Sequence, residues 1–216
     1  MTTRCPAACI LAIAIALTTG IAHSDTVIEG WVELPKATAV AVVNKRYQVV
    51  TKGGETMINP PQGVVYLEGH FPKPAVQPVA QMVQKNLAFT TPLLPVQVGT
   101  KVEFPNQDDA FHNIFSFSPT KRFDLGRYRP EERPIPSQVF DAPGSVTLRC
   151  DIHEHMRGLI LVLETPHFTT TKTDGTYRLT GLPAGRYKLK AWVSSTKILE
   201  RMVDVKAGTT QKVDFP

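Results

Sequence analysis

The sequence predicts an all-β fold, a Greek-key β-sandwich with a second, smaller β-sandwich beside it. Apolar and polar residues alternate in several segments, as in residues 145–150, and this period of two is typical of strands. The 18 prolines and 14 glycines indicate many turns. Residues 79–88 give the best helical candidate, but they directly follow Pro78 and space their apolar residues unevenly, so a strand is expected there at least as readily.

Further short segments have the composition and spacing of strands. The run 158–163 is continuously apolar, which predicts a strand buried on both faces. The segments after Pro166 form too few strands to bury a good core alone. We expect the strands at residues 27–32, 63–68, 94–98, 101–104, 145–150, 158–163, 176–179, 187–193, 202–205 and 211–215.

Residues 1–24 have the features of a secretory signal peptide. Arg4 is their only charge, an apolar stretch follows, and small residues at Ala22 and Ser24 predict cleavage before Asp25. The apolar run is too short to cross a bilayer, and no later stretch is long enough for a membrane span. We therefore expect an exported, periplasmic protein.

The charge balance bears on possible partners. The chain has 24 Lys and Arg and 19 Asp and Glu, so loss of Arg4 with the leader leaves a net charge of +4. This excess is too small and too dispersed to predict nucleic-acid binding, and it is compatible with an acidic redox partner.

Without the leader, Cys150 is the one remaining cysteine, so it has no intramolecular disulfide partner in an oxidising compartment. His153 and Met156 follow it by three and six positions, and His112 precedes it by 38. One thiolate, two imidazoles and a weak thioether make the ligand set of a mononuclear electron-transfer copper site. The sequence therefore predicts a metal site at these four residues.

Each candidate also has a simpler interpretation. Cys150 could be a buried inert thiol, and Met156 could fill the core. His155 is either a surface residue at the rim of the site or a competitor of Met156 for the metal. Zinc also binds one Cys with two His, but a structural zinc site needs four strong ligands and Met is a poor one.

Residues 80–166 resemble a cupredoxin of the plastocyanin and amicyanin type. The resemblance rests on residues 98–106, 111–114 and 142–144 and on the loop that begins at Cys150, whose ligand spacing is similar to that of amicyanin. It implies one type 1 copper ion held strongly by His112, Cys150 and His153, with Met156 as the axial ligand. The amide of Asn113 is then expected to hydrogen-bond to the Cys150 loop.

One segment departs from the cupredoxin pattern. Residues 119–137 form a polar insert between His112 and the Cys150 strand. Charged runs are usually solvated, but this insert follows the first ligand closely and could cap the copper edge. Its five basic residues are Lys121, Arg122, Arg127, Arg129 and Arg133.

Residues 167–216 resemble a carboxypeptidase regulatory-like, or transthyretin-like, module. The resemblance rests on residues 173–179 and 182–187, with two further strand motifs of that family far upstream at 30–32 and 64–67. We therefore expect the copper domain, residues 76–166, to be inserted into one split β-sandwich made of residues 25–75 and 167–216. Two consecutive domains with an N-terminal extension are the alternative.

These features predict an exported one-electron carrier rather than an enzyme, because no carboxylate pair or activated nucleophile is recognisable. The implied partner is a redox protein such as a cytochrome c or a periplasmic dehydrogenase; no oligomeric state is predicted. The alternative is a carbohydrate- or protein-binding module whose cupredoxin domain holds copper as a chaperone or sensor.

Overall fold

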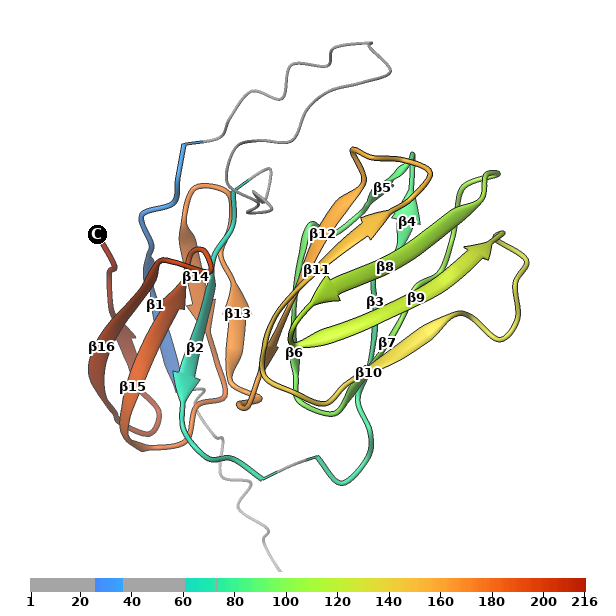
Figure 1. Cartoon of the computed structure of the whole chain (residues 1–216). Coiled ribbons are helices and arrows are strands. Elements are labelled where there is room, and N and C mark those ends of the chain that lie inside the picture. Colours follow the sequence, from blue (N-terminus) through green and yellow to red (C-terminus); the bar gives the residue numbers. More distant parts are fainter. Residues whose placement is uncertain (1–25, 37–60, 73) are drawn as a thin grey trace, which may run out of the picture.

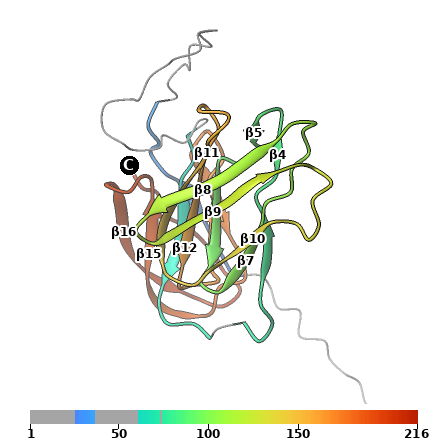
Figure 2. The same cartoon turned by 45° about the vertical axis from the view of Figure 1, so that its right-hand side comes forward.

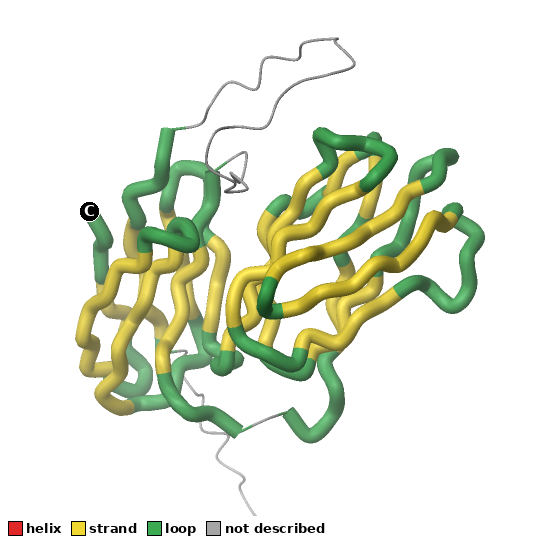
Figure 3. Tube along the Cα trace, in the orientation of Figure 1, coloured by secondary structure: helices red, strands yellow, loops and turns green. Residues whose placement is uncertain are grey.

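The computed structural model describes residues 26–36, 61–72 and 74–216. Within these residues the regular elements are all strands, and they form two β-sandwiches side by side (Figures 1 and 3). The all-β prediction is confirmed. The expected leader, residues 1–24, lies outside the described residues, and none of the described residues belongs to a helix long and apolar enough to cross a membrane.

The first sandwich contains the residues expected to bind metal. Its strands are β3 (Val79–Gln81), β4 (Gln84–Lys85), β5 (Ala88–Phe89), β6 (Leu93–Gln97), β7 (Thr100–Glu103), β8 (His112–Ser118), β9 (Lys121–Tyr128), β10 (Ser137–Phe140), β11 (Gly144–Cys150) and β12 (Arg157–Leu163). A five-stranded sheet, β6-β12-β11-β8-β9, and a three-stranded sheet, β10-β7-β3, enclose a shared core, and β4 and β5 form a separate hairpin.

The second sandwich joins both ends of the described chain. Its strands are β1 (Val27–Trp31), β2 (Val64–Glu68), β13 (Phe168–Thr170), β14 (Thr176–Leu179), β15 (Gly185–Trp192), β16 (Ile198–Val205) and β17 (Thr210–Lys212). They form a four-stranded sheet, β13-β2-β15-β16, and a three-stranded sheet, β14-β1-β17. The expected pairing of the N-terminal strands with strands after residue 166 is therefore present: β1 lies between β14 and β17, and β2 between β13 and β15.

Gly30 in β1 shows how closely the two ends of the chain approach. A Cβ atom at this position would lie 1.8 Å from the backbone oxygen of Val213. Only glycine leaves room for the C-terminal segment to cross here, where the Val213 N–H donates a 2.9 Å hydrogen bond to the Glu29 oxygen.

Two segments that were not firmly expected to be strands, residues 79–88 and the start of the polar insert, form strands in the structure. Residues 79–88 contain β3, β4 and the first residue of β5 rather than a helix, and Met82 and Gln84 are fully buried. The polar insert begins with β9, which pairs antiparallel with β8. The alternation that makes β9 a strand is visible in its sequence, because Phe123 and Leu125 pack on the core and their charged neighbours are exposed.

The two sandwiches are joined by an apolar junction. Strand β12 is buried on both faces, as expected: Ile160 and Val162 point into the first core, and its outer residues meet the second sandwich. The junction contains Val64, Leu93, Leu159, Leu161, Leu163 and Trp192, with Tyr66 and Phe168 packed against them. Burial of each such side chain stabilises by about 1.5–3 kcal/mol, so the contact holds the sandwiches together.

Candidate metal centre

Strand register brings the first two candidate ligands together. His112 begins β8 and Cys150 ends β11, and the two strands pair so that Cys150 lies opposite Ile114. Because side chains two apart share a face, His112, Ile114 and Cys150 all point into the first sandwich. His112 is 0% exposed and Cys150 is buried, so both donors are shielded from water.

The loop after Cys150 supplies the third donor. Residues 151–156 connect β11 to β12 in one tight turn, and the Met156 N–H donates a 2.8 Å hydrogen bond to the His153 oxygen. This turn places Nδ1 of His153 3.7 Å from Sγ of Cys150. The imidazole of His153 is only partly buried, and its ring centre lies 4.9 Å from that of His112.

The three donors have the separations that a metal ion requires. Nδ1 of His112 lies 3.9 Å from Sγ of Cys150, and the ligand atoms of all three residues lie within 4.8 Å of one another. Bonds of about 2.3 Å to sulfur and about 2.0 Å to imidazole, meeting at about 120°, separate S and N by about 3.7 Å. The residues present therefore fit a trigonal site with one thiolate and two imidazoles.

Asp108 orients His112, and the sequence reasoning missed this residue. Its Oδ2 lies 3.0 Å from Nε2 of His112, so the other ring nitrogen, Nδ1, is directed at Cys150. A carboxylate on the outer nitrogen fixes the tautomer of a metal-binding imidazole and raises its basicity. The only available signal was a carboxylate four residues before the histidine, which is a weak pattern in a loop.

The backbone of the β4–β5 hairpin anchors Asp108. The N–H groups of Asn86 and Leu87 donate to its two carboxylate oxygens at 2.6 and 2.9 Å. Both hairpin residues have a positive φ, 57° and 59°, which turns their N–H groups to one side. Burial raises the pKa of Asp108, but these N–H groups and His112 outweigh that effect and the net pKa is lowered, so the carboxylate is charged.

His153 and His155 differ in environment. The pKa of His153 is lowered, first by burial and then by repulsion from His112 and His155, so its ring is a neutral donor at pH 7. His155 is exposed and is not part of the converging group. It lies beside the site, with its ring centre 6.2 Å from that of His153.

The structure places Met156 in the same core cluster as Cys150, but among the described residues it does not show the hydrogen bond expected from Asn113. Met156 is fully buried in the first core in a cluster with Cys150, which places its thioether on the protein side of the loop. The hydrogen bond expected from Asn113 to the Cys150 loop is not formed among the described residues. Asn113 is buried, and its Oδ1 has no hydrogen-bond partner there.

The polar insert contacts both ligand-bearing segments. Arg127 of β9 forms a 3.1 Å ion pair with Asp151 in the Cys150 loop. Arg129 lies over the ring of Phe111, the neighbour of His112, at 4.4 Å from the ring centre. The insert therefore covers part of the rim beside the histidines, while Phe111 and Ile152 stay partly exposed.

The two other histidines among the described residues, His70 and His167, lie outside this centre. His167 packs edge-on against Phe71 in the second sandwich, with ring centres 4.7 Å apart. His70, which immediately precedes Phe71 in the sequence, is exposed. Neither belongs to a group of converging metal donors within the described residues.

No protein-family model matches the sequence, and no curated protein matches it. Solved structures similar to this chain include amicyanins and a cupredoxin. The reduced Cu(I) form of an amicyanin variant at pH 4 is 22% identical, with a TM-score of 0.36, and the match covers 46% of this chain and 98% of that one. A purple cupredoxin from Nitrosopumilus maritimus is 24% identical, with a TM-score of 0.34, over 39% of this chain and 99% of the other.

Proposed function

We propose that this protein is an exported, periplasmic one-electron carrier that binds a single type 1 copper ion. The observation that carries this proposal is the convergence of Sγ of Cys150 with Nδ1 of His112 and of His153 at 3.9 and 3.7 Å. In this proposal Met156 is the axial ligand. Copper bound by this set would supply a one-electron couple between Cu(I) and Cu(II).

The protein contributes a fixed arrangement of donors. Cys150 and His112 stand on paired strands, and Asp108 holds the ring of His112 from behind. The short turn from His153 to Met156 is closed by a backbone hydrogen bond. Because these groups are already in place, little has to reorganise when an electron arrives or leaves. The part-exposed ring of His153 is the route to a redox partner such as a c-type cytochrome or a periplasmic dehydrogenase.

Substitution at Cys150 tests the proposal directly. The oxidised, copper-loaded protein should have an intense visible absorption from thiolate-to-metal charge transfer, and Cys150→Ser should abolish it without loss of the β-sheet circular dichroism. His155→Ala, which removes a neighbouring exposed imidazole, is the matched control and should keep the colour. A Cys150→Ser protein that stays coloured would refute the proposal.

We infer that the second sandwich is a single domain, residues 25–75 and 167–216, interrupted by the copper domain, residues 76–166. The support is the position of β1 and β2 between strands that follow residue 166. The resemblance of this sandwich to a carboxypeptidase regulatory-like module remains part of the proposal.

A groove in this second sandwich favours a second candidate function, ligand binding by the module. Trp31 is 40% exposed and lines a groove of about 620 Å³ together with Thr169, Thr170 and several charged residues. An exposed indole ring beside hydroxyl and charged groups suits the stacking of a carbohydrate ring. Titration with soluble oligosaccharides should shift Trp31 fluorescence if this candidate is right, and Trp31→Ala should remove the binding.

A further inference from the structure

The outer face of the five-stranded sheet is covered over only part of its width. Residues alternate along each strand, so Phe115 and Phe117 of β8 point away from the core that contains Ile114. Figure 2 shows β8 and β9 running across the front of the first sandwich, with β7 and β10 beside them at the lower right. Phe117 lies opposite Arg122 of β9 in the cross-strand register and lines a groove together with Thr147 of β11.

The second sandwich covers the other half of the same face. Across the sheet, Thr147 lies opposite Leu159 of β12, and Leu159 lies opposite Leu93 of β6. Both leucines are buried in the junction. The uncovered half is therefore continuous with an apolar interface that the protein already uses. We name this uncovered half the Phe–Arg face: Phe115, Phe117, Arg122, Thr147, Arg149 and Arg157.

The centre of the Phe–Arg face is aromatic and open. Phe117 is 72% exposed, and its ring centre lies 5.1 Å from that of Phe115. The two rings line a groove of about 430 Å³ together with Thr147 and Arg149. Large aromatic side chains left in water beside a groove are typical of the centre of a protein interface.

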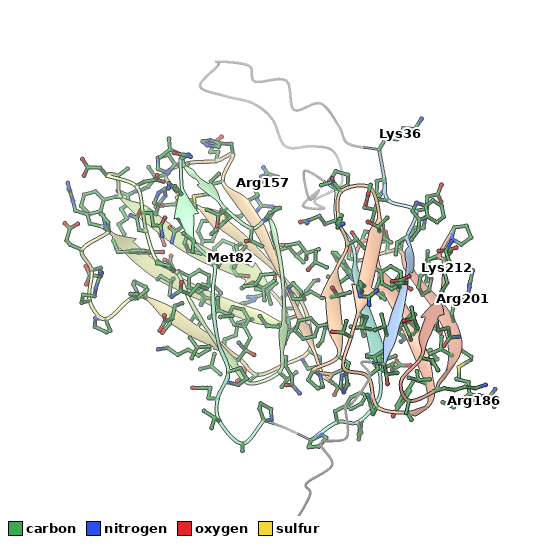
Figure 4. All side chains as sticks on the ribbon, turned by 180° about the vertical axis from the view of Figure 1, so that it is seen from behind. Lys36, Met82, Arg157, Arg186, Arg201 and Lys212 are labelled. Atoms are coloured by element: carbon green, nitrogen blue, oxygen red, sulfur yellow. The ribbon has the colours of Figure 1, made fainter. Side chains whose placement is uncertain are left out.

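Three arginines border the aromatic pair. Arg149 lies opposite Phe115 in the register and also opposite Arg157 of β12, so the two guanidinium groups share the outer face. Arg157, labelled in Figure 4, stands at the start of β12 beside the junction. Within the described residues, Arg122, Arg149 and Arg157 form no ion pair, unlike Arg127, which pairs with Asp151.

Asp124 is the one carboxylate among the outward-facing strand residues of the uncovered half. It lies opposite Phe115 on β9, and its Oδ1 accepts a hydrogen bond from the Gly126 N–H at 2.9 Å. The Phe–Arg face therefore has an excess of positive charge around an apolar centre. The surface complementary to it is acidic with an exposed apolar patch.

We propose that the Phe–Arg face is a docking surface for an acidic protein that presents an apolar patch. The arginines attract and orient the partner, and its apolar patch covers Phe115 and Phe117. The site lies on the reverse side of the strand pair that carries Cys150, because Arg149 precedes Cys150 in β11 and Phe115 follows Ile114 in β8. The surface is thus separate from the histidine rim at Phe111 and Ile152.

Binding to two cytochromes of opposite charge tests this inference. The purified ¹⁵N-labelled protein is titrated with a small acidic c-type cytochrome and with a basic one as a charge-reversed probe. The acidic probe should shift the amide signals of Phe115, Phe117 and Arg149 and bind more weakly as salt is added. The basic probe should leave these signals in place.

Variants assign the binding to the face. Phe117→Ser should weaken the acidic probe at least about 10-fold, and so should the pair Arg122→Glu and Arg149→Glu. Met202→Ser and Arg186→Glu are control changes at exposed positions of the second sandwich. Arg186 is labelled in Figure 4. These variants should alter binding by less than about 2-fold.

Four results would overturn the proposal: no binding of the acidic probe, equal binding of the basic probe, signal shifts centred on Phe111 and Ile152, or an equal effect of Arg186→Glu. Self-association of the protein that Phe117→Ser abolishes would also overturn it, because the occupant would then be a second copy. This readout needs no metal. Failure of the copper proposal would appear as an absent colour and would leave the binding result intact.

Discussion

Oδ2 of Asp108 lies 3.0 Å from Nε2 of His112, while Nδ1 of the same ring faces Sγ of Cys150 at 3.9 Å. The imidazole is therefore held from both sides before any metal binds. The hairpin N–H groups at Asn86 and Leu87 fix the carboxylate in turn. The candidate metal centre thus depends on a chain of contacts that begins at a turn outside the loops that carry the candidate ligands.

Replacement of this carboxylate should weaken and retune the site. We expect Asp108→Asn to lower copper affinity about 10–100-fold and to raise the reduction potential, because a neutral amide donates less electron density to the ring than a carboxylate. Competition with a chelator and redox titration measure the two effects. Asp109→Asn, at the adjacent carboxylate, is the control and should change neither. Wild-type affinity and potential in Asp108→Asn would show that the carboxylate only packs beside the ring.

Met156 should tune the site without being required for it. The thioether is buried, and leucine fills nearly the same volume, so Met156→Leu should cost less than about 1.5 kcal/mol of stability. We expect this variant to keep copper and to have a higher reduction potential, because a soft donor is replaced by an apolar group. If His155→Ala changes the spectrum more than Met156→Leu does, then His155 and not Met156 is the axial ligand.

His167 should make the metal-free protein less stable in mild acid. Burial lowers its pKa, and its ring packs on Phe71. In the unfolded chain the His167 ring binds a proton near pH 6.5, and in the folded chain it does so only at a lower pH. The free energy of unfolding therefore rises with pH between these two values, and this stability is lost as the pH falls below about 6.5. Urea denaturation at several pH values gives the free energy of unfolding as a function of pH. This free energy should rise less steeply with pH for His167→Gln than for wild type. Parallel curves would exclude this role.

The convergence of His112, Cys150 and His153 was predictable because its signals are local. Strand alternation directs Cys150 inward, and a His three residues later can reach the same candidate site across a short loop. The role of Asp108 was not predictable in this way. It depends on a left-handed backbone at Asn86 and Leu87, more than 20 residues away, and leucine gives no sequence signal for a positive φ.

The alternation of apolar and polar residues likewise predicted where strands lie better than it predicted which side chains cover them. The apolar run 158–163 indicated burial on both faces, and β12 has it, but the run does not say that Trp192 and Val64 cover its outer side. In β9 the alternation of Phe123 and Leu125 with charged residues was present. The density of arginines nevertheless favoured a solvated insert over a strand, and tertiary pairing with β8 decided the outcome.

Truncation tests how the two sandwiches depend on each other. A fragment of residues 25–166 keeps β1 and β2 but loses every strand that pairs with them. Amide exchange should be fast at residues 27–31 in this fragment, and it should aggregate through Val64, Val65 and Leu67, which are fully buried in the whole protein. Native-like protection of residues 27–31 would show that β1 belongs to the copper domain.

A fragment of residues 76–166 keeps β3 to β12 with their shared core, so it should fold and bind copper. It also exposes the junction leucines on the outer face of β12 and β6, which the second sandwich buries in the whole chain. We therefore expect it to self-associate, and Leu161→Gln should restore a monomer, because a polar side chain at the centre of that exposed row weakens apolar contact. Sedimentation of the two versions, each with its copper spectrum, measures this effect. A monomeric wild-type fragment would mean that the junction is not the apolar contact that holds the two sandwiches together.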